Sequence, residues 1–438
     1  MMASQTSLEE KIVELENSKQ IPQNSRTQIQ RVAEYLKNRK DFEKHYSPKL
    51  VSIGPIHHGN TSNANLKLGE KYKLTWAAKY IENAGLNPCD LHKKIIDNID
   101  ELKGHFSDDV LTLAGKSLEG FGSLEEKLSW MLFVDGCSLL YILEKAKLDE
   151  PGHMNIKVDQ LVLVMMDVLL LENQLPYVVL KLLWKDNNES ELIKSMKMFL
   201  TRHPWATLES ILELLTIISF SWEKLPTHLL DLQRNIILFT QSKSPKNLES
   251  HVRKMSYRSV QSLRAVGIRL KSTATRNPQS IEFAEGWFTA KLTLPEIVVD
   301  DRSAATILNL IAYEMCPDFE NDYGICSFAT FMDSLIDHPE DVKLLRSKGI
   351  LLNSPWSDEE VANLFNSIRT NFIPDTEIYF KVRAKIDEHY CNRWKTWIGQ
   401  GLNTYFSNPW AFIAFVAAFI ALALTLIQTW FTVQPASK

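Results

Sequence analysis

Two adjacent histidines, His57 and His58, are the obvious candidates for chemistry in this chain. They lie in the stretch VSIGPIHHGN, where Gly54 and Pro55 end a short extended run and a Gly-Asn pair predicts a turn. Imidazoles bind metals and move protons, but adjacent histidines cannot share a helix face, and no Cys or carboxylate completes a metal set at a familiar spacing. Two hypotheses follow: a metal or catalytic site, or a packed turn whose imidazoles bond to backbone carbonyls.

Two other pairs have a chemical and a structural interpretation. Asp135 and Cys137 could form a nucleophile with a helper, but no base lies at a recognisable spacing, and a lone cysteine in the apolar run MLFVDGCSLLYIL is typical of a core residue. Asp300 and Asp301 could bind a metal, but without a third ligand we expect them to cap the helix that follows. We therefore predict no catalytic residue, no metal site and no cofactor.

The run LVLVMMDVLLLENQLPYVVLKLLW, within residues 158–184, predicts the centre of the soluble body. Its uninterrupted apolar part is too short to span a membrane, so we expect a core helix in which Asp167 needs a hydrogen-bonding partner. Glu172, Asn173 and Gln174 come shortly before Pro176, and proline disfavours a helical residue before it. We expect a break or kink at this polar cluster. Its side chains either form a binding pocket or satisfy backbone groups freed by the break.

The remaining pattern predicts a mainly α fold: a large multi-helix soluble body, a small β-meander near residues 281–299, and one C-terminal transmembrane helix. Val51 and Ile53 suggest a short strand. In a helix expected at 66–84, Tyr72, Trp76 and Tyr80 form a stripe, with the lysines elsewhere. Further helices are expected at 29–46, 91–102, 124–146, 192–200, 208–220, 225–239, 303–315, 327–335, 339–347, 357–370 and 378–398.

A basic amphipathic helix is predicted over residues 253–271. No acidic residue occurs between Glu249 and Glu282, and an apolar stripe accompanies the basic residues: Val260, Leu263, Val266 and Leu270. Such a helix can lie on an anionic membrane surface, with Arg258, Arg264 and Arg269 as candidate lipid contacts. Alternatively, it docks on the body and its basic face is solvated.

The stretch NPWAFIAFVAAFIALALTLIQTWFTVQPASK predicts a membrane anchor at residues 409–431. No charge occurs between Lys395 and Lys438, and a helix of about 22 residues would span about 33 Å, enough for a bilayer core of roughly 30 Å. The alternative, a buried core helix, would usually keep a polar face. The anchor residues that we expect to face lipid are Trp410, Phe412, Phe415, Phe419, Leu422, Leu426 and Trp430.

Length and composition are those of an ordinary globular body. The chain has 438 residues, 45% of them hydrophobic and 23% charged, which is enough for a sizeable core or two fused lobes. A net charge of −4 argues against a general nucleic-acid binder. Five scattered cysteines favour reduced thiols over a disulfide framework.

The layout predicts a single-pass, C-terminally tail-anchored protein. The N-terminus has no apolar core and carries acid early, so it does not resemble a signal peptide. Arg393 and Lys395 precede the span and only Lys438 follows it, which favours a cytosolic body. In the alternative topology the body faces outward at the plasma membrane, and Asn60 and Asn188 become candidate glycosylation sites.

Four segments are expected from these patterns. They are an exposed N-terminal helix or tail at 1–25, a helical domain at 26–405 with a candidate loop or linker at 240–251, the transmembrane helix at 409–431, and a short tail at 432–438.

Several long motifs occur in a specific order: VSIGPIHHG, LKLGEKYKL, MLFVDGCSLLYIL, DVLLLENQLPYVVLKLL, THLLDL, and a late block from DDRSAATILNLIAYEMC to SDEEVANLFNSI. Together they resemble the plant-specific domain of unknown function 247 family, also called uncharacterised protein family 0481, over roughly residues 26–435. The family's early Arg-Val-Pro motif ends here in Ala33, which affects only the local turn. The motif residues that we single out are Gly54, Pro55, His57, His58, Glu172, Asn173, Gln174 and Pro176.

The resemblance implies no established enzymatic activity and carries over no catalytic residue. Some grass members are, or are similar to, pollen-side determinants of self-incompatibility, which implies recognition of other proteins in part of the family. We therefore expect a non-enzymatic, membrane-anchored component of protein recognition or signalling, with an unknown protein partner. The alternatives are a membrane-bound, hydrolase-like enzyme that uses His57 or His58 with Asp167, Glu172 or Cys137, and a lipid-surface sensor that uses the basic helix.

Overall fold

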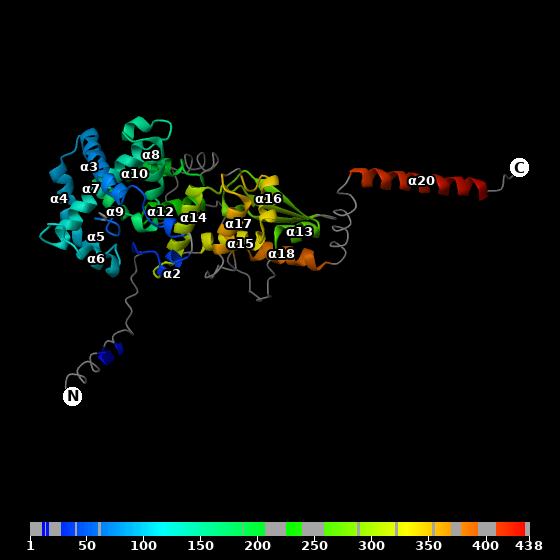
Figure 1. Ribbon diagram of the computed structural model, residues 1–438, viewed down its shortest axis with the longest axis horizontal. Coiled ribbons are helices and arrows are strands. Elements are labelled where there is room, and N and C mark those ends of the chain that lie inside the picture. Colours follow the sequence, from blue (N-terminus) through cyan, green and yellow to red (C-terminus); the bar gives the residue numbers. More distant parts are fainter. Residues whose placement is uncertain are drawn as a thin grey trace.

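The computed structural model describes a mainly helical body with a small sheet, and a separate C-terminal helix (Figure 1). The described residues are 11–13, 15–16, 28–39, 42–59, 63–186, 188–205, 225–238, 258–286, 290–319, 323–352, 355–368, 378–392 and 409–433. The predicted linker at 240–251, the predicted helix at 208–220, Asn60 and the tail from residue 434 lie outside them. Of the predicted N-terminal helix, the described residues are helical and exposed.

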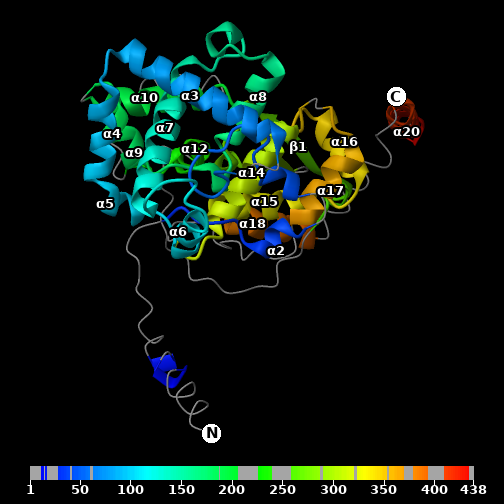
Figure 2. The ribbon, with the colours of Figure 1, turned by 60° about the vertical axis from the view of Figure 1, so that its left-hand side comes forward.

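Two hydrophobic cores divide the body, and the first lies in an all-helical lobe. Helix α7 (Leu124–Lys145) is apolar on most sides and is buried in the middle of this lobe, with α3 (Ala64–Ala84) packed along it (Figure 2). The Ser123 side chain caps α7 by accepting a hydrogen bond from the Glu126 N–H. The other helices are α4 (Pro88–Asp97), α5 (Ile99–Lys103), α6 (Asp108–Gly115), η2 (Pro151–Met154), α8 (Val158–Asp167), η3 (Leu171–Asn173), α9 (Tyr177–Leu183) and α10 (Glu189–Leu200).

The central apolar run is broken, as predicted, but the break begins at Asp167, before the polar cluster where the sequence predicts it. α8 ends at Asp167, and the chain bends by 99° before it continues through η3 into α9. Pro176 is the N-cap of α9, the position at which its missing N–H costs no helical hydrogen bond. The bend directs the polar residues of η3 toward the middle of the body instead of along a helix face.

The second core is formed by helices on one face of a three-stranded sheet. The strands β1 (Ile268–Thr273), β2 (Glu282–Glu285) and β3 (Ala290–Pro295) lie in the order β1-β3-β2, with β3 parallel to β1 and antiparallel to β2. The helices are α12 (Leu229–Ile237), α13 (Val260–Ala265), η5 (Pro278–Ser280), α14 (Asp301–Glu314), α15 (Gly324–Leu335), α16 (Pro339–Ser347), α17 (Asp358–Ile368) and α18 (Phe380–Cys391). As predicted, Asp300 caps α14, through hydrogen bonds with Ser303.

The predicted basic helix at 253–271 is wrong after Ala265, and its residues 253–257 lie outside the described part of the chain. α13 ends at Ala265, Gly267 has a φ of 84°, and Arg269 lies on β1. Leu270, expected on the apolar stripe of the helix, instead lies opposite Leu292 across the sheet. Pairing with β3 overrides the helical period, so the predicted meander gains a parallel strand from outside residues 281–299.

The predicted helix at 29–46 is wrong as well. Among the described residues there, only α2 (Glu34–Lys37) and η1 (Glu43–His45) are helical. We call the described residues of 28–57 the N-terminal strap. The strap runs between the two cores, with Val32 packed in the second and Ile53 in the first. The residues around Val51 are buried but form no strand.

Helix α20 (Pro409–Val433) stands away from the body at the C-terminal end of the chain (Figure 1). Residues Ile413–Thr432 are long and apolar enough to cross a membrane. The bent pair of α8 with Leu171–Leu183 passes the same test of composition, but its side chains are mostly buried in the first core. α20 is therefore the one described helix that is both apolar and exposed.

Gly69 sets the distance between α3 and the strap, which makes it a test of this packing. A Cβ at Gly69 would lie 1.8 Å from the carbonyl oxygen of Leu50. We expect Gly69→Ala to separate the two elements and to lower the free energy of unfolding by about 1–3 kcal/mol in a denaturant titration. Gly152→Ala is the control, because a Cβ there has no neighbouring atom within 4 Å. Equal stability of the two variants would contradict the close contact.

Candidate functional site

Glu172 is the centre of a polar cluster between the strap and the break. Its buried carboxylate accepts hydrogen bonds from the Val32 N–H at 2.8 Å and from His57 Nε2 at 3.0 Å, and it forms an ion pair with Lys37 Nζ at 2.6 Å. The Lys37 and His57 side chains are 21% and 16% exposed, so they form the solvent edge of the cluster. Glu172 thereby joins the beginning and the end of the strap.

Asp167 and Asn173 hold the middle of the strap. The Asp167 carboxylate accepts the N–H groups of residues 49, 50 and 51 at 2.9, 2.7 and 2.9 Å. Asn173 accepts the Ile53 N–H at 2.6 Å and donates to the Val51 carbonyl at 2.9 Å. These side chains supply the partners that a neighbouring strand would supply, and the predicted strand at Val51 and Ile53 is wrong.

Gln174 and Asn309 connect the cluster to the second lobe. Gln174 accepts the Leu230 N–H of α12 at 3.0 Å. Asn309 of α14 accepts the Leu171 N–H at 2.8 Å and donates to the His45 carbonyl of the strap at 2.8 Å. The polar residues at the break therefore contact backbone groups, as the second of the two hypotheses for this cluster expects.

Gly54 and Pro55 form the turn at the end of the strap, as the sequence predicts. Gly54 has a φ of 77°, and a Cβ there would lie 2.8 Å from the Gln174 carbonyl oxygen, so no other residue fits without strain. The Gly54 N–H donates to Asp135 on α7 at 2.8 Å. The turn is thus tied to both the break and the central helix.

Asp135 pairs with a cation instead of assisting Cys137. Its carboxylate lies 2.6 Å from Lys73 Nζ on α3, and both side chains are buried. Burial raises the pKa of Cys137 to about 12, so this thiol stays protonated at neutral pH and is a poor nucleophile. The nucleophile-and-helper hypothesis therefore has no support in the geometry.

The two histidines face different acids. His57 contacts Glu172, and His58 Nε2 lies 3.6 Å from the carboxylate of Glu119. The expectation that the imidazoles bond to backbone carbonyls is thus wrong for His57, whose partner is the Glu172 carboxylate. No group of three potential metal ligands occurs within the described part of the chain.

The charges in the cluster are stabilised by their neighbours. Burial would raise the pKa of Glu172, but His57 and Lys37 outweigh burial and hold this pKa below its ordinary value. Burial raises the pKa of Asp167 to about 6, although the backbone N–H donors act in the opposite direction. Burial disfavours the charge of Lys73, yet Asp135 and Glu70 hold the pKa of Lys73 above its ordinary value. Glu172 and Lys73 therefore keep their charges in the buried cluster because each has partners of opposite charge.

This arrangement is suited to fixing the backbone of the strap by hydrogen bonds, and is less suited to catalysis. A general acid or base needs a proton or lone pair directed at a substrate. Glu172 instead has donors on both oxygens, and Asp167 is committed to three backbone N–H groups. Only His57 and Lys37 reach the solvent edge, so we assign the buried members positioning roles.

The predicted lipid contacts are separated by the structure. Arg258 lies 3.4 Å from Asp387 and stacks on the ring of Tyr390, so it is part of the packing of α18. Arg264 on α13 and Arg269 on β1 are exposed. One of the three residues is therefore used within the fold, and the other two are open to solvent.

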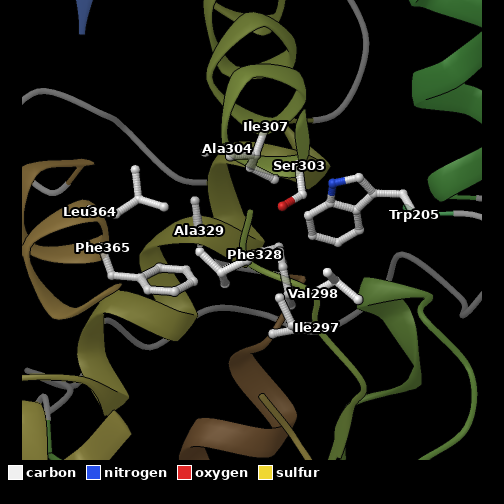
Figure 3. A pocket seen from close by; sticks show the side chains of 11 residues that line it. Trp205, Ile297, Val298, Ser303, Ala304, Ile307, Phe328, Ala329, Leu364 and Phe365 are labelled. Atoms are coloured by element: carbon white, nitrogen blue, oxygen red, sulfur yellow. The ribbon is translucent and has the colours of Figure 1, made fainter. Parts of the chain in front are cut away.

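A pocket in the second lobe is a different kind of site (Figure 3). It encloses about 320 Å³, part of which is open to solvent. Its lining consists of Trp205, Ile297, Val298, Val299, Ser303, Ala304, Ile307, Phe328, Ala329, Leu364 and Phe365. Figure 3 shows the Ser303 hydroxyl among rings and aliphatic groups, and none of the lining residues is titratable. The pocket suits apolar contact and contains none of the sequence-predicted site residues.

Sequence comparison places these elements in a family. The family model described as "Plant protein of unknown function", DUF247, matches residues 29–424, from the strap into α20. The chain belongs to the DUF247 family. Two Arabidopsis thaliana proteins are similar to it: UPF0481 protein At3g47200, 25% identical over 427 residues (88% of this chain and 82% of that protein), and putative UPF0481 protein At3g02645, 30% identical over 179 residues (40% and 33%). No solved structure matches the chain.

The sequence analysis missed three residues that contact the polar cluster or its neighbours in this DUF247 protein: Lys37, Lys73 and Asn309. The burial of Lys73 could have been predicted, because Lys73 lies on the same face of the helix as Trp76 and Tyr80. A lysine on a buried face indicates that an acidic side chain is buried beside it. The expectation that the lysines of this helix lie elsewhere is wrong for Lys73. Lys37 and Asn309 had no comparable signal, since their partners are distant in the chain.

Glu172→Gln tests the charge at the junction. Because the pKa of Glu172 is lowered in the folded protein, its ion pairs stabilise the fold above the unfolded value of about 4.5, and this contribution is lost as the pH falls through the lowered pKa. We expect the variant to be less stable by about 1–3 kcal/mol near neutral pH, with the difference shrinking below about pH 4.5. Urea titrations across this pH range measure it.

Glu191→Gln is the matched control for that series. Glu191 and Lys194 form an exposed pair on α10 at 3.3 Å, so its loss should leave stability nearly unchanged at every pH. A Glu172→Gln effect that does not vary with pH would contradict a charged junction.

The buried pair of Lys73 and Asp135 is tested by a double-mutant cycle. We expect Lys73→Met to cost about 3–5 kcal/mol, because it leaves the Asp135 carboxylate buried without its counter-ion. Adding Asp135→Asn should recover part of this loss, since an asparagine carbonyl can still accept the Gly54 N–H without carrying a charge. Chemical denaturation measures the four proteins. A double variant as unstable as the sum of the single variants would show that the two charges do not interact.

Proposed function

We propose that the chain is a single-pass membrane protein anchored by α20, and that its helical body recognises other proteins without catalysing a reaction. The observation that carries the proposal is the exposure of a long apolar helix outside both cores. α20 has 25 residues, about 38 Å at the usual helical rise, which exceeds a bilayer core of roughly 30 Å.

The side chains of α20 support an anchoring role. Trp410, Phe415, Phe419, Leu422, Leu426 and Trp430 are between 58% and 76% exposed. An apolar surface of this size is unfavourable in water and is expected to be covered by lipid or by protein. The Thr425 and Thr429 hydroxyls donate to carbonyls one turn earlier, which satisfies them within the helix.

The recognition role is supported by how the body uses its polar residues. The groups that could do chemistry, Asp135, Asp167 and Glu172, are occupied by backbone N–H groups and cations of the fold. The family description assigns no activity. A protein with this arrangement can act through its surfaces while its buried polar cluster keeps the two lobes in register.

One observation favours the alternative of a membrane-bound enzyme. His57 Nε2 lies 3.0 Å from the Glu172 carboxylate, a geometry in which an acid orients an imidazole, and the imidazole reaches solvent. Against it, Glu172 is shared with Val32 and Lys37, and no nucleophile among the described residues contacts His57. Near pH 7, an enzyme would lose turnover in Glu172→Gln molecules that remain folded, whereas a positioning role changes stability alone.

The side of the membrane is part of the proposal. We propose a cytosolic body, because all five cysteines are free and the flanking charges Arg393 and Lys395 precede the span. In the outward-facing alternative, Asn188 is available for glycosylation, since it is exposed at the N-cap of α10.

Charge insertion into α20 tests the anchor. We expect the full-length protein to resist carbonate extraction from membranes and Phe419→Arg/Leu422→Arg to be released, since each central arginine costs about 2.5–3.5 kcal/mol on insertion. The control carries the same two charges beyond the span, as Gln434→Arg/Ala436→Arg, and should stay with the membrane. Release of the parent protein by carbonate would refute anchoring.

Protease protection with a glycosidase shift on the same membranes decides the orientation. A digestible, unglycosylated body is the result expected for a cytosolic side. A protected body that carries sugar at Asn60 or Asn188 would overturn that side and favour recognition at the cell surface.

A further inference from the structure

We propose that the outer face of the three-stranded sheet rests on the anionic headgroups of the membrane that holds α20. This inference depends on the proposed anchoring and adds the orientation of the body to it. The residues that carry it are Arg269 and Lys271 of β1 and Lys291 of β3, which we call the basic sheet face.

The strand register places these three residues together. Arg269 lies opposite Lys291 in the parallel pair of β1 and β3, and Lys271 is two residues further along β1, on the same side of the sheet. All three are exposed, and none forms an ion pair with an acid among the described residues. Glu282 is the acid on this face, but it lies on the far strand β2, opposite Thr293.

The fold itself does not account for this concentration of charge. Like charges directly opposite each other destabilise a sheet. Lysine and arginine on an edge strand can be explained as protection against aggregation, and β1 is an edge strand. Lys291, however, is on the central strand β3, where no such protection is needed. An anionic surface outside the chain accounts for all three residues.

The location of the sheet identifies that surface as the membrane. The inner face of the sheet is covered by α18, where His389 contacts Phe283 and lies 3.2 Å from the Val266 carbonyl oxygen. α18 ends at Cys391, and α20 begins at Pro409. Figure 1 shows the sheet and α18 at the end of the body that lies toward α20.

The connecting residues agree with this placement. Residues 392–408 reach at most about 60 Å when fully extended, so the sheet can touch the bilayer surface but is not forced to do so. They include Arg393 and Lys395 and contain no acid. A negative surface potential acts within about a Debye length and favours each nearby Lys or Arg by about fivefold in binding. The basic sheet face then decides which end of the body lies on the membrane.

Lysine footprinting of the full-length chain tests the inference. The protein is inserted into nanodiscs of phosphatidylcholine alone, or with about 30% phosphatidylserine, and acetylated before mass spectrometry. We expect Lys271 and Lys291 to react several-fold more slowly in the anionic discs, and the difference to vanish at about 1 M NaCl, where the Debye length is about 3 Å. Lys67 and Lys71, exposed on α3 in the first lobe, serve as internal controls and should react alike in both discs.

A charge reversal keeps the test specific. Arg269→Glu should reduce the protection of Lys271 and Lys291, whereas Lys93→Glu, the same change at an exposed position of α4, should not. Failure of the chain to insert in either disc would refute anchoring, and this inference with it. Insertion with equal reactivity of Lys271 and Lys291 in both discs would overturn this inference alone and would point to an acidic protein as the partner of the basic sheet face.

Discussion

The N-terminal strap sets the constraint on which the rest of the body depends, because its backbone lies between two cores without a neighbouring strand. A buried N–H without an acceptor costs about 1–3 kcal/mol. Side chains from the break and from α7 accept six such groups, those of residues 32, 49, 50, 51, 53 and 54. The break in the central run follows from this constraint, since a continuous helix would present Asp167 and Asn173 on different faces and could not direct both at the strap.

The second lobe solves the same problem in the same way. Glu314, buried at the end of α14, accepts the N–H groups of Ile325 and Cys326 at 3.0 and 2.8 Å and the Arg234 guanidinium at 2.7 Å. A carboxylate makes stronger hydrogen bonds to backbone donors than a neutral acceptor, but it needs a cation or several donors when it is buried. Glu172, Asp135 and Glu314 each have a Lys or Arg partner. Asp167 has three N–H donors instead, and burial raises its pKa to about 6.

The sequence predicted most helices because each has a local signal, such as the Ser357–Glu360 capping box or the apolar density of α7. It also predicted the break, because Pro176 acts on the residue before it. It failed where a distant partner decides the local structure. β1 exists because β3 pairs with it, and much of the strap is not helical because Glu172 and Asp167 accept its N–H groups. The residues of the buried cluster were visible as a motif, but their contacts depend on pairs that no local pattern relates, such as Asn309 with Leu171.

The same contacts limit where function can lie. The contacts that Asp135, Glu172 and Gly54 make within the fold account for these residues. Their presence in the family motifs therefore does not require a bound ligand. Any recognition of other molecules must then use the surface of the protein. If the basic sheet face rests on the membrane, the first lobe extends away from it, because α4 lies at the end of the body opposite the sheet (Figure 1). That places Trp130, which is 42% exposed and in ring contact with His92 on α4, on the side of the protein that faces the aqueous phase and other proteins.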